Sequence, residues 1–164
     1  MLVPAILYKD EIQRAFAKEL YTKEHFYYNG YAHCNTITKI TLEDNVYQFA
    51  IVNDAGELKG YLAYRVDPNT ESVYNFGLYS FDKGNPLIGY DLFTEMERLV
   101  SLYHRVEWRM IGGNPVKKHY DKFCKKHGGN VVRLHDVCKD PLGNYVDEYI
   151  YEIVKGLSDG KSDD

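Results

Sequence analysis

The sequence predicts an α+β fold, a three-layer arrangement in which helices flank a mixed, mostly antiparallel central sheet. Three observations lead to this prediction. Strand-like segments at 46–52, 58–66 and 73–81 follow one another across short turns, as in an antiparallel meander. A helix-like segment, a strand at 105–111 and a second helix-like segment come next, and this order favours a parallel crossover. Two further strands joined by a turn close the chain.

Length and composition indicate one domain. The chain has 164 residues, of which 45% are hydrophobic and 27% charged, and this is enough for one domain with a substantial core. We expect the domain to cover 1–155 and the polar tail 156–164 to be disordered. No stretch approaches a membrane span, and the net charge of −4 argues against a nucleic-acid binder.

The cysteine and histidine patterns do not predict a metal site. Cys34, Cys124 and Cys138 have no close metal-type spacing and cannot all pair within one chain. We therefore expect reduced thiols in a cytoplasmic protein. The six histidines show no ligand spacing either, so we expect no metal.

The N-terminal region is predicted to supply an edge strand, a helix and a loop. The apolar run 1–7 indicates the strand, and Asp10 can cap a helix whose apolar residues recur at helical spacing. The aromatic stretch 23–35 has no clean period. We interpret it as a short helix and loop that can wall a substrate pocket, and its candidate wall residues are Tyr27, Tyr28 and Tyr31.

The third strand of the meander contains one unusual residue. Gly77 is unfavourable there unless it marks a bulge or lets another group approach the backbone closely. A twisted strand with the glycine packed under an aromatic ring explains the same residue equally well.

The tripeptide Gly-Asn-Pro occurs twice, at 84–86 and 113–115, each time between a strand-like and a helix-like segment. Asn is a preferred N-cap and Pro is preorganised for the first helical position, so each copy predicts a helix start. Such a start favours phosphate through its free N–H groups and its dipole, and the alternative is two ordinary capped helices. The predicted buried stripes are Ile88, Leu92, Met96, Leu99 and Tyr103, with Asp91 and Glu95 outside the stripe, and Val116, Tyr120, Phe123 and Cys124.

The last two strands, 130–138 and 144–154, flank a turn at 139–143 and are predicted to form a closing hairpin. Exposed tyrosines on this hairpin would suit an interface between two copies of the chain.

In this order of elements the chain resembles the GNAT superfamily of N-acetyltransferases over nearly its whole length. Residues 82–90 (DKGNPLIGY) stand at the place of the family's pyrophosphate loop, Gln/Arg-x-x-Gly-x-Gly/Ala. Gly89 matches that motif, whereas Gly84 and Leu87 replace the Gln/Arg and the first Gly. Asn114, followed by the YDKF stretch that begins at Tyr120, resembles the family's Asn-containing helix start and its Tyr-Glu-Lys-Leu stretch, at a separation one residue shorter.

The resemblance implies that an amine attacks the thioester of acetyl-CoA directly. The pantetheine arm would bind like an added strand along 77–81, and N–H groups near Leu78 or Tyr79 would stabilise the oxyanion. Tyr120 would protonate the leaving thiolate, although core packing accounts for this residue as well. The implied cofactor-binding residues are Leu78, Tyr79, Phe81, Gly84, Asn85, Leu87, Ile88, Gly89, Tyr90 and Asn114.

Other charged residues are open to two interpretations. Three carboxylates, Glu71, Glu107 and Asp136, lie near candidate strand ends. Each is either a general base or a solvated carboxylate. One face of the second crossover helix carries Lys118, Lys122 and Lys126, which would contact the 3′-phosphate of coenzyme A or an acidic partner, or form a solvated face.

Two functions from different classes follow. The first is an acyl-CoA-dependent N-acyltransferase that acts on a small amine or a protein amino group, with neither nucleic acid nor membrane as a partner. The second is a GNAT-like binding or assembly module without catalysis, which the reduced pyrophosphate-loop motif favours.

Overall fold

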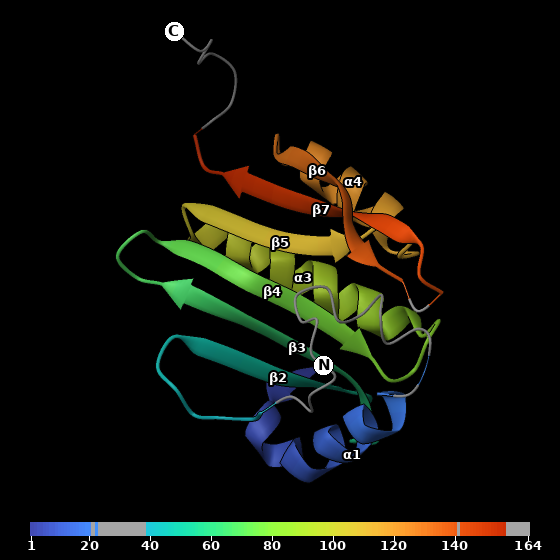
Figure 1. Cartoon of the computed structure of the whole chain (residues 1–164). Coiled ribbons are helices and arrows are strands. Elements are labelled where there is room, and N and C mark those ends of the chain that lie inside the picture. The colour runs from blue at the N-terminus through green and yellow to red at the C-terminus, as the bar shows by residue number, and fades with distance from the viewer. Residues whose placement is uncertain (21, 23–38, 141, 157–164) are drawn as a thin grey trace, which may run out of the picture.

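The computed structural model describes residues 1–20, 22, 39–140 and 142–156, and its strands form one seven-stranded sheet (Figure 1). Every neighbouring pair of strands is antiparallel except β4 and β5, which are parallel. This confirms the mixed, mostly antiparallel sheet. In the spatial order of the sheet, the strands are β1 (Leu2–Pro4), β2 (Val46–Val52), β3 (Leu58–Asp67), β4 (Ser72–Ser80), β5 (Arg105–Ile111), β7 (Tyr145–Val154) and β6 (Asn130–Lys139).

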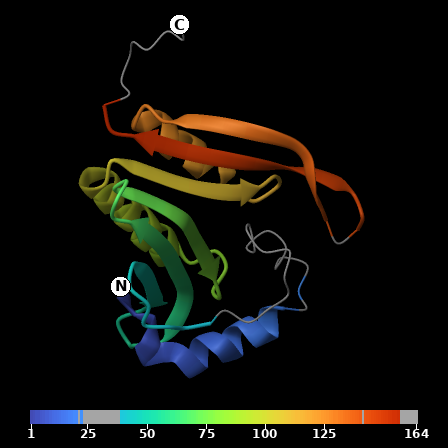
Figure 2. The ribbon, with the colours of Figure 1, turned by 60° about the vertical axis from the view of Figure 1, so that its left-hand side comes forward.

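Helices cover the two faces of the sheet, as predicted (Figures 1 and 2). The helices α3 (Pro86–Leu102) and α4 (Lys117–Lys126) pack on one face around Trp108. The short 3-10 helix η1 (Ala5–Tyr8) and the helix α1 (Lys9–Glu19) pack on the other face around Phe16. Successive strand residues divide between these two cores because strand side chains alternate between the faces: Ile51 belongs to the first core, and Ala50 and Val52 belong to the second.

The predicted segments agree with the observed elements to within one or two residues in the sheet. The run 1–7 supplies a short edge strand paired with β2, and its second half is η1, which the sequence analysis did not predict. The predicted pocket wall at Tyr27, Tyr28 and Tyr31 and the tail from 157 onward lie outside the described residues.

Two carboxylates of α3 are buried, although the sequence placed them on the solvent-facing side of the helix. Asp91 and Glu95 are 9% and 7% exposed, so placing them outside the buried stripe was wrong. Glu95 Oε1 accepts hydrogen bonds from the Tyr64 hydroxyl at 2.8 Å and from Arg98 at 2.6 Å. Asp91 Oδ2 lies 2.5 Å from the Met1 amino nitrogen. Burial is tolerated because each carboxylate has a charged partner.

The strand β4 contains a β-bulge at Asn75, and beyond it β4 separates from β5. Asn75 has a left-handed φ of 53°, and two residues of β4, Asn75 and Phe76, oppose the single residue Tyr64 of β3 at this point. The described pairing between β4 and β5 ends at Phe76 and Trp108. From there β4 continues beside β3 and β5 beside β7, and Figure 2 shows their ends diverging. The two strands therefore splay apart, as the resemblance implied.

Gly77 is not the bulge residue, and no aromatic ring of the described residues packs where its Cβ would lie. A Cβ built on Gly77 would meet no described atom within 4 Å. The described residues leave room here for another group to approach the backbone closely, which stays a prediction.

None of the described helices is long and apolar enough to cross a membrane. Within the described ranges, Cys124 and Cys138 are free thiols, and no group of three or more His, Cys, Asp or Glu is arranged to hold a metal ion.

Candidate active site

A cavity of about 500 Å³ opens where β4 ends and where α3 and α4 begin. Leu78 and Ser80 of β4 form one wall, and the residues that lead into α4 form another. The wall from α3 is largely apolar and includes Ile88, Leu92 and Phe93. Because ligands of sheet proteins with crossover helices bind beyond the carboxyl ends of the strands, this cavity is the first candidate for the functional site.

Both copies of Gly-Asn-Pro lie at this cavity and have the same local structure. The two glycines have left-handed φ values of 84° and 89°, which glycine adopts without steric cost. In the first copy the Asn85 side chain accepts the N–H of Leu87 at 3.0 Å. In the second copy the Asn114 side chain accepts the N–H of Val116 at 3.1 Å. The repeated tripeptide therefore builds one structural unit twice, and the fold brings the two units together.

The second copy does not begin its helix directly. Asn85 is the N-cap of α3, as predicted, but α4 begins at Lys117, three residues after Asn114. The residues between them form a turn in which the Lys117 N–H donates to the Asn114 carbonyl at 3.1 Å. The prediction that Asn114 caps the helix was wrong for this reason.

The pairing of β4 with β3 determines which main-chain groups of β4 point into the splay. The Phe81 N–H donates to the Lys59 carbonyl at 2.9 Å, so Phe81 is a hydrogen-bonded position of this antiparallel ladder. Hydrogen-bonded and non-hydrogen-bonded positions alternate along a strand. Tyr79 therefore bonds to β3, whereas the N–H and C=O groups of Leu78 and Ser80 point toward the side from which β5 has separated.

Tyr120 lines the cavity from the first turn of α4. Its ring packs between Trp108, Tyr151 and Phe93, with centroid distances of 5.7, 5.8 and 6.0 Å. Its hydroxyl has no hydrogen-bond partner among the described residues, and burial raises the pKa of the phenol above its ordinary value. A phenol in this state keeps its proton and can donate it to a group that enters the cavity.

The surroundings of Tyr120 are held rigidly. Trp108 and Tyr151 stack with centroids 5.1 Å apart and planes 2° from parallel. The Tyr151 hydroxyl donates to Asp121 at 2.8 Å, and Lys117 donates to the other oxygen of Asp121 at 2.7 Å. These contacts join β5, β7 and α4 around the phenol ring.

The structure brings together most of the residues that the resemblance implied. Seven of them line the cavity, namely Leu78, Gly84, Asn85, Ile88, Gly89, Asn114 and Tyr120. Tyr79 and Phe81 lie on the opposite face of the sheet, where both rings pack against Phe16. Leu87 and Tyr90 point outward from α3 and are 44% and 70% exposed.

Comparison with solved structures gives the fold. A candidate phosphinothricin N-acetyltransferase superimposes with a TM-score of 0.66 at 12% identity, over 94% of this chain and 96% of that one. A GCN5-related N-acetyltransferase from Kribbella flavida gives 0.63 at 16% identity, over 87% and 89%. The spermidine/spermine N-acetyltransferase SpeG from Vibrio cholerae gives 0.54 at 14% identity, over 68% and 66%.

The chain has the GNAT fold. The splayed pair β4 and β5 and the crossover through α3 are present in the same chain order that the sequence predicted. The sequence itself matches no protein-family model and no curated protein, so the structural likeness alone carries this assignment.

Three further residues, which were not singled out from the sequence, also line the cavity. Ser80 is a buried polar residue at the end of β4, and Phe93 faces α4 from the second turn of α3. His119 comes immediately before Tyr120 and lies 6.4 Å from the Phe93 ring. His119 could have been found from the sequence because it directly precedes the candidate acid, Tyr120. It was missed because it lies in a helix rich in basic residues.

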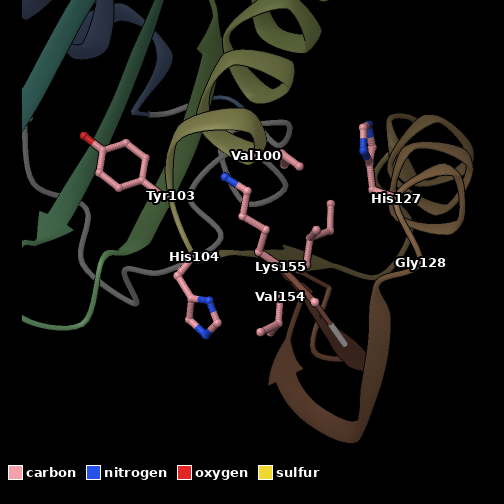
Figure 3. A pocket seen from close by; sticks show the side chains of 9 residues that line it. Val100, Tyr103, His104, His127, Gly128, Val154 and Lys155 are labelled. Atoms are coloured by element: carbon pink, nitrogen blue, oxygen red, sulfur yellow. The ribbon is translucent and has the colours of Figure 1, made fainter. Parts of the chain in front are cut away.

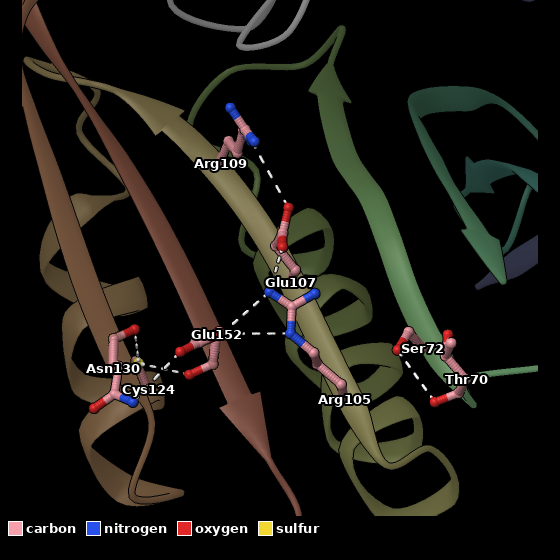
Figure 4. Close-up of polar contacts among 8 residues, drawn as sticks. All are labelled: Thr70, Ser72, Arg105, Glu107, Arg109, Cys124, Asn130 and Glu152. Atoms are coloured by element: carbon pink, nitrogen blue, oxygen red, sulfur yellow. Dashed lines mark hydrogen bonds and ion pairs between the residues drawn. The ribbon is translucent and has the colours of Figure 1, made fainter. Parts of the chain in front are cut away.

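The three carboxylates considered as bases do not line the cavity. Glu107 lies on β5 in a row of ion pairs with Arg105 at 2.5 Å and Arg109 at 3.8 Å, and Arg105 also contacts Glu152 (Figure 4). The other two, Glu71 and Asp136, have left-handed φ values of 49° and 54° at the ends or bends of strands. The lysine face of α4 is partly paired, since Lys126 forms an ion pair with Glu97 of α3.

A second, smaller cavity of about 210 Å³ lies at the opposite end of α3 (Figure 3). Tyr103, His104, His127 and Lys155 contribute to its lining. Lys155 donates from Nζ to the carbonyl of Ser101 at 2.7 Å, which ties the end of β7 to the end of α3. None of the site residues implied by the resemblance lines this cavity.

Proposed function

We propose that this protein is an N-acyltransferase that transfers the acyl group of acetyl-CoA to an amine by direct attack. One observation carries the proposal: the splay between β4 and β5 opens beside a cavity that is lined by a buried tyrosine, Tyr120, on a chain with the GNAT fold. The acceptor is a small amine or a protein amino group, and the free thiols suit a cytoplasmic location.

The main chain of β4 supports binding of the donor. The N–H and C=O groups of Leu78 and Ser80, which point away from β3, suit the two amides of a pantetheine arm, which would bind like an added strand. The Leu78 N–H is then available to the thioester oxygen, whereas the Tyr79 N–H bonds to β3. One well-placed donor of this kind contributes about 3–4 kcal/mol to stabilisation of the transition state.

The reaction forms a C–N bond and breaks the C–S bond of the thioester. The amine attacks the carbonyl carbon and loses one proton to solvent. The tetrahedral intermediate expels the thiolate, and the thiolate takes a proton from the Tyr120 hydroxyl. The phenolate regains its proton from solvent. Gly84, Asn85, Ile88, Gly89 and Asn114 would flank the donor, whereas Tyr79, Phe81, Leu87 and Tyr90 lie away from the cavity and take no direct part.

Thermal unfolding with and without acetyl-CoA tests the proposal. A donor at about 100 times its dissociation constant adds about 2.7 kcal/mol of stability, which corresponds to a rise of about 5–10 °C in Tm for a chain of this size. Absence of a shift with acetyl-CoA, propionyl-CoA and free coenzyme A would contradict an acyltransferase and favour a binding or assembly module. A released-thiol assay over a panel of amines then identifies the acceptor class.

The outer strand β6 offers a surface for a second copy of the chain. Val131, Val132 and Val137 of β6 are 44%, 50% and 47% exposed on this edge of the sheet, and Tyr145 of the hairpin partner β7 is 64% exposed. Sedimentation velocity would show whether this edge pairs two chains in solution.

A further inference from the structure

Resting on the proposed function, we infer that the site recognises its donor as an acyl-pantetheine thioester and that the nucleotide diphosphate of coenzyme A contributes little to affinity. The geometry of the loop from Ser80 to α3 points to this. At this place a donor diphosphate would need free N–H groups and unpaired cations, whereas the N–H groups at the start of α3 and the two lysines beside the loop already have partners.

The N–H groups at the start of α3 already have acceptors. Pro86 has no N–H, the Leu87 N–H donates to the Asn85 side chain at 3.0 Å, and the Ile88 N–H donates to the Asn85 carbonyl at 3.2 Å. The Asn85 N–H donates to the carbonyl of Asp82 at 3.2 Å. A helix start binds an anion through N–H groups that lack partners, and here the side chain and carbonyl of one asparagine occupy them.

The turn that precedes α4 uses its N–H groups in a similar way. Pro115 has no N–H, and the Val116 and Lys117 N–H groups donate to the side chain and carbonyl of Asn114 at 3.1 Å each. A phosphate excluded from the start of α3 would therefore find the N–H groups of this turn occupied as well. Both copies of Gly-Asn-Pro therefore act as self-capped turns.

Charge on the loop opposes a diphosphate as well. The Asp82 carboxylate accepts a hydrogen bond from Asn85 Nδ2 at 3.0 Å, so it lies directly beside the helix start. Lys59 lies 3.2 Å from Glu57 and 3.6 Å from Asp82, and Lys83 lies 3.3 Å from Glu19. These two lysines face three carboxylates. Among the described residues that line the cavity, none is Lys or Arg.

The same cavity suits the arm of the donor. Its wall from α3 is apolar, and the main-chain groups of Leu78 and Ser80 can pair with the pantetheine amides. The recognised unit is thus the acyl-pantetheine thioester, whether coenzyme A or the phosphopantetheine arm of a carrier protein supplies it.

Calorimetric titration of the unaltered chain with S-acetylpantetheine, S-acetyl-4′-phosphopantetheine and acetyl-CoA tests the inference and separates these sources. We expect the three dissociation constants to agree within about 10-fold, because a hydrogen bond to a charged phosphate would by itself contribute about 10- to 100-fold. The dissociation constant of acetyl-CoA should also change by less than about 3-fold between about 50 and about 500 mM NaCl.

A double variant reverses the two features that exclude phosphate. Asn85→Gly with Asp82→Asn releases the Leu87 N–H and removes the carboxylate, and glycine remains an acceptable N-cap. We expect it to bind acetyl-CoA at least about 10-fold more tightly than S-acetylpantetheine. The matched control is Asn144→Gly with Asp140→Asn in the turn between β6 and β7, away from the cavity, where Asn144 Nδ2 donates to Asp140 Oδ2 at 3.1 Å as Asn85 Nδ2 does to Asp82. It should bind all three donors as the unaltered chain does.

Each outcome decides the matter. Binding of acetyl-CoA more than about 10-fold tighter than S-acetylpantetheine by the unaltered chain overturns the inference and leaves the acyltransferase proposal intact. Equal preference in the double variant and its control overturns the assigned role of Asn85 and Asp82. Failure of all three donors to bind overturns the proposed function and this inference with it.

Discussion

In the proposed reaction Tyr120 is the acid, because it combines burial with a hydroxyl that has no partner among the described residues. Packing against Trp108 and Tyr151 fixes the position of its ring, and the raised pKa keeps its proton in place. The same burial is what made core packing an equally good interpretation from the sequence. The structure joins the two interpretations, since the residue both packs in the core and lines the cavity.

Replacing Tyr120 by Phe tests its role as an acid. We expect turnover with an accepted amine to fall by about 100-fold or more, while the dissociation constant of acetyl-CoA stays nearly the same, because only proton transfer is lost. Steady-state kinetics and calorimetry measure the two quantities. The control is Tyr145→Phe, which removes an exposed hydroxyl. Equal loss of turnover and affinity, or loss of neither, would count against the acid role.

The sequence predicted the role of a residue correctly where that role depends on neighbours in the chain. It failed where the role depends on contacts with another strand or helix. Asn85 was predictable as a cap because the capping contact spans two residues. The choice between Leu78 and Tyr79 as the free donor depends on the phase of the ladder with β3, which no single strand encodes. Burial of Glu95 depends on Tyr64, 31 residues away in sequence.

At the scale of elements, the bulge in β4 accounts for the splay. A bulge adds a residue to one strand, bends it and increases its twist, and here the described β4–β5 pairing ends directly after Asn75. The strands, helices and crossover were predictable from hydrophobic periodicity. The sequence offered Gly77 as one possible bulge position and did not indicate Asn75, because glycine is the usual marker and Asn in a left-handed conformation is a weaker one.

Substitutions at Asn75 test the bulge. Asn75→Val places a β-branched residue at φ 53° and should lower the free energy of unfolding by about 1–3 kcal/mol. Asn75→Gly, which accepts this conformation without strain, should leave stability unchanged or slightly higher. Urea unfolding measures both. Equal effects of the two substitutions would contradict a left-handed bulge at this position.

For the whole molecule, buried tyrosines link stability to alkaline pH. Burial raises the pKa of Tyr61 to about 12, despite a hydrogen bond from Gln48, and it raises the pKa of Tyr64, Tyr120 and Tyr151. Because the pKa of each of these tyrosines is higher in the folded state than in the unfolded state, the unfolded tyrosines ionise first as pH rises. The stability that the buried, protonated tyrosines contribute is therefore complete below about pH 10 and is lost as pH rises further.

Urea unfolding between about pH 8 and pH 11 measures this loss. Above about pH 10 the free energy of unfolding should fall by up to about 1.4 kcal/mol per pH unit for each such tyrosine. Tyr61→Phe should make the fall shallower, whereas the exposed-site control Tyr145→Phe should not change it. A flat profile, or the same slope in both variants, would contradict the assignment.

The central claim is that a thioester donor binds along β4 in the splay between β4 and β5, and amide hydrogen exchange tests it most directly. In the free protein the amides of Leu78 and Ser80 should exchange quickly because β5 does not pair with them, whereas the Tyr79 amide, bonded to β3, should exchange slowly. Saturating S-acetylpantetheine should slow exchange at Leu78 and Ser80 and leave Tyr79 as it was. Unchanged exchange at Leu78 and Ser80 with the donor bound, or protection confined to the cavity between Tyr103 and Lys155, would contradict the claim.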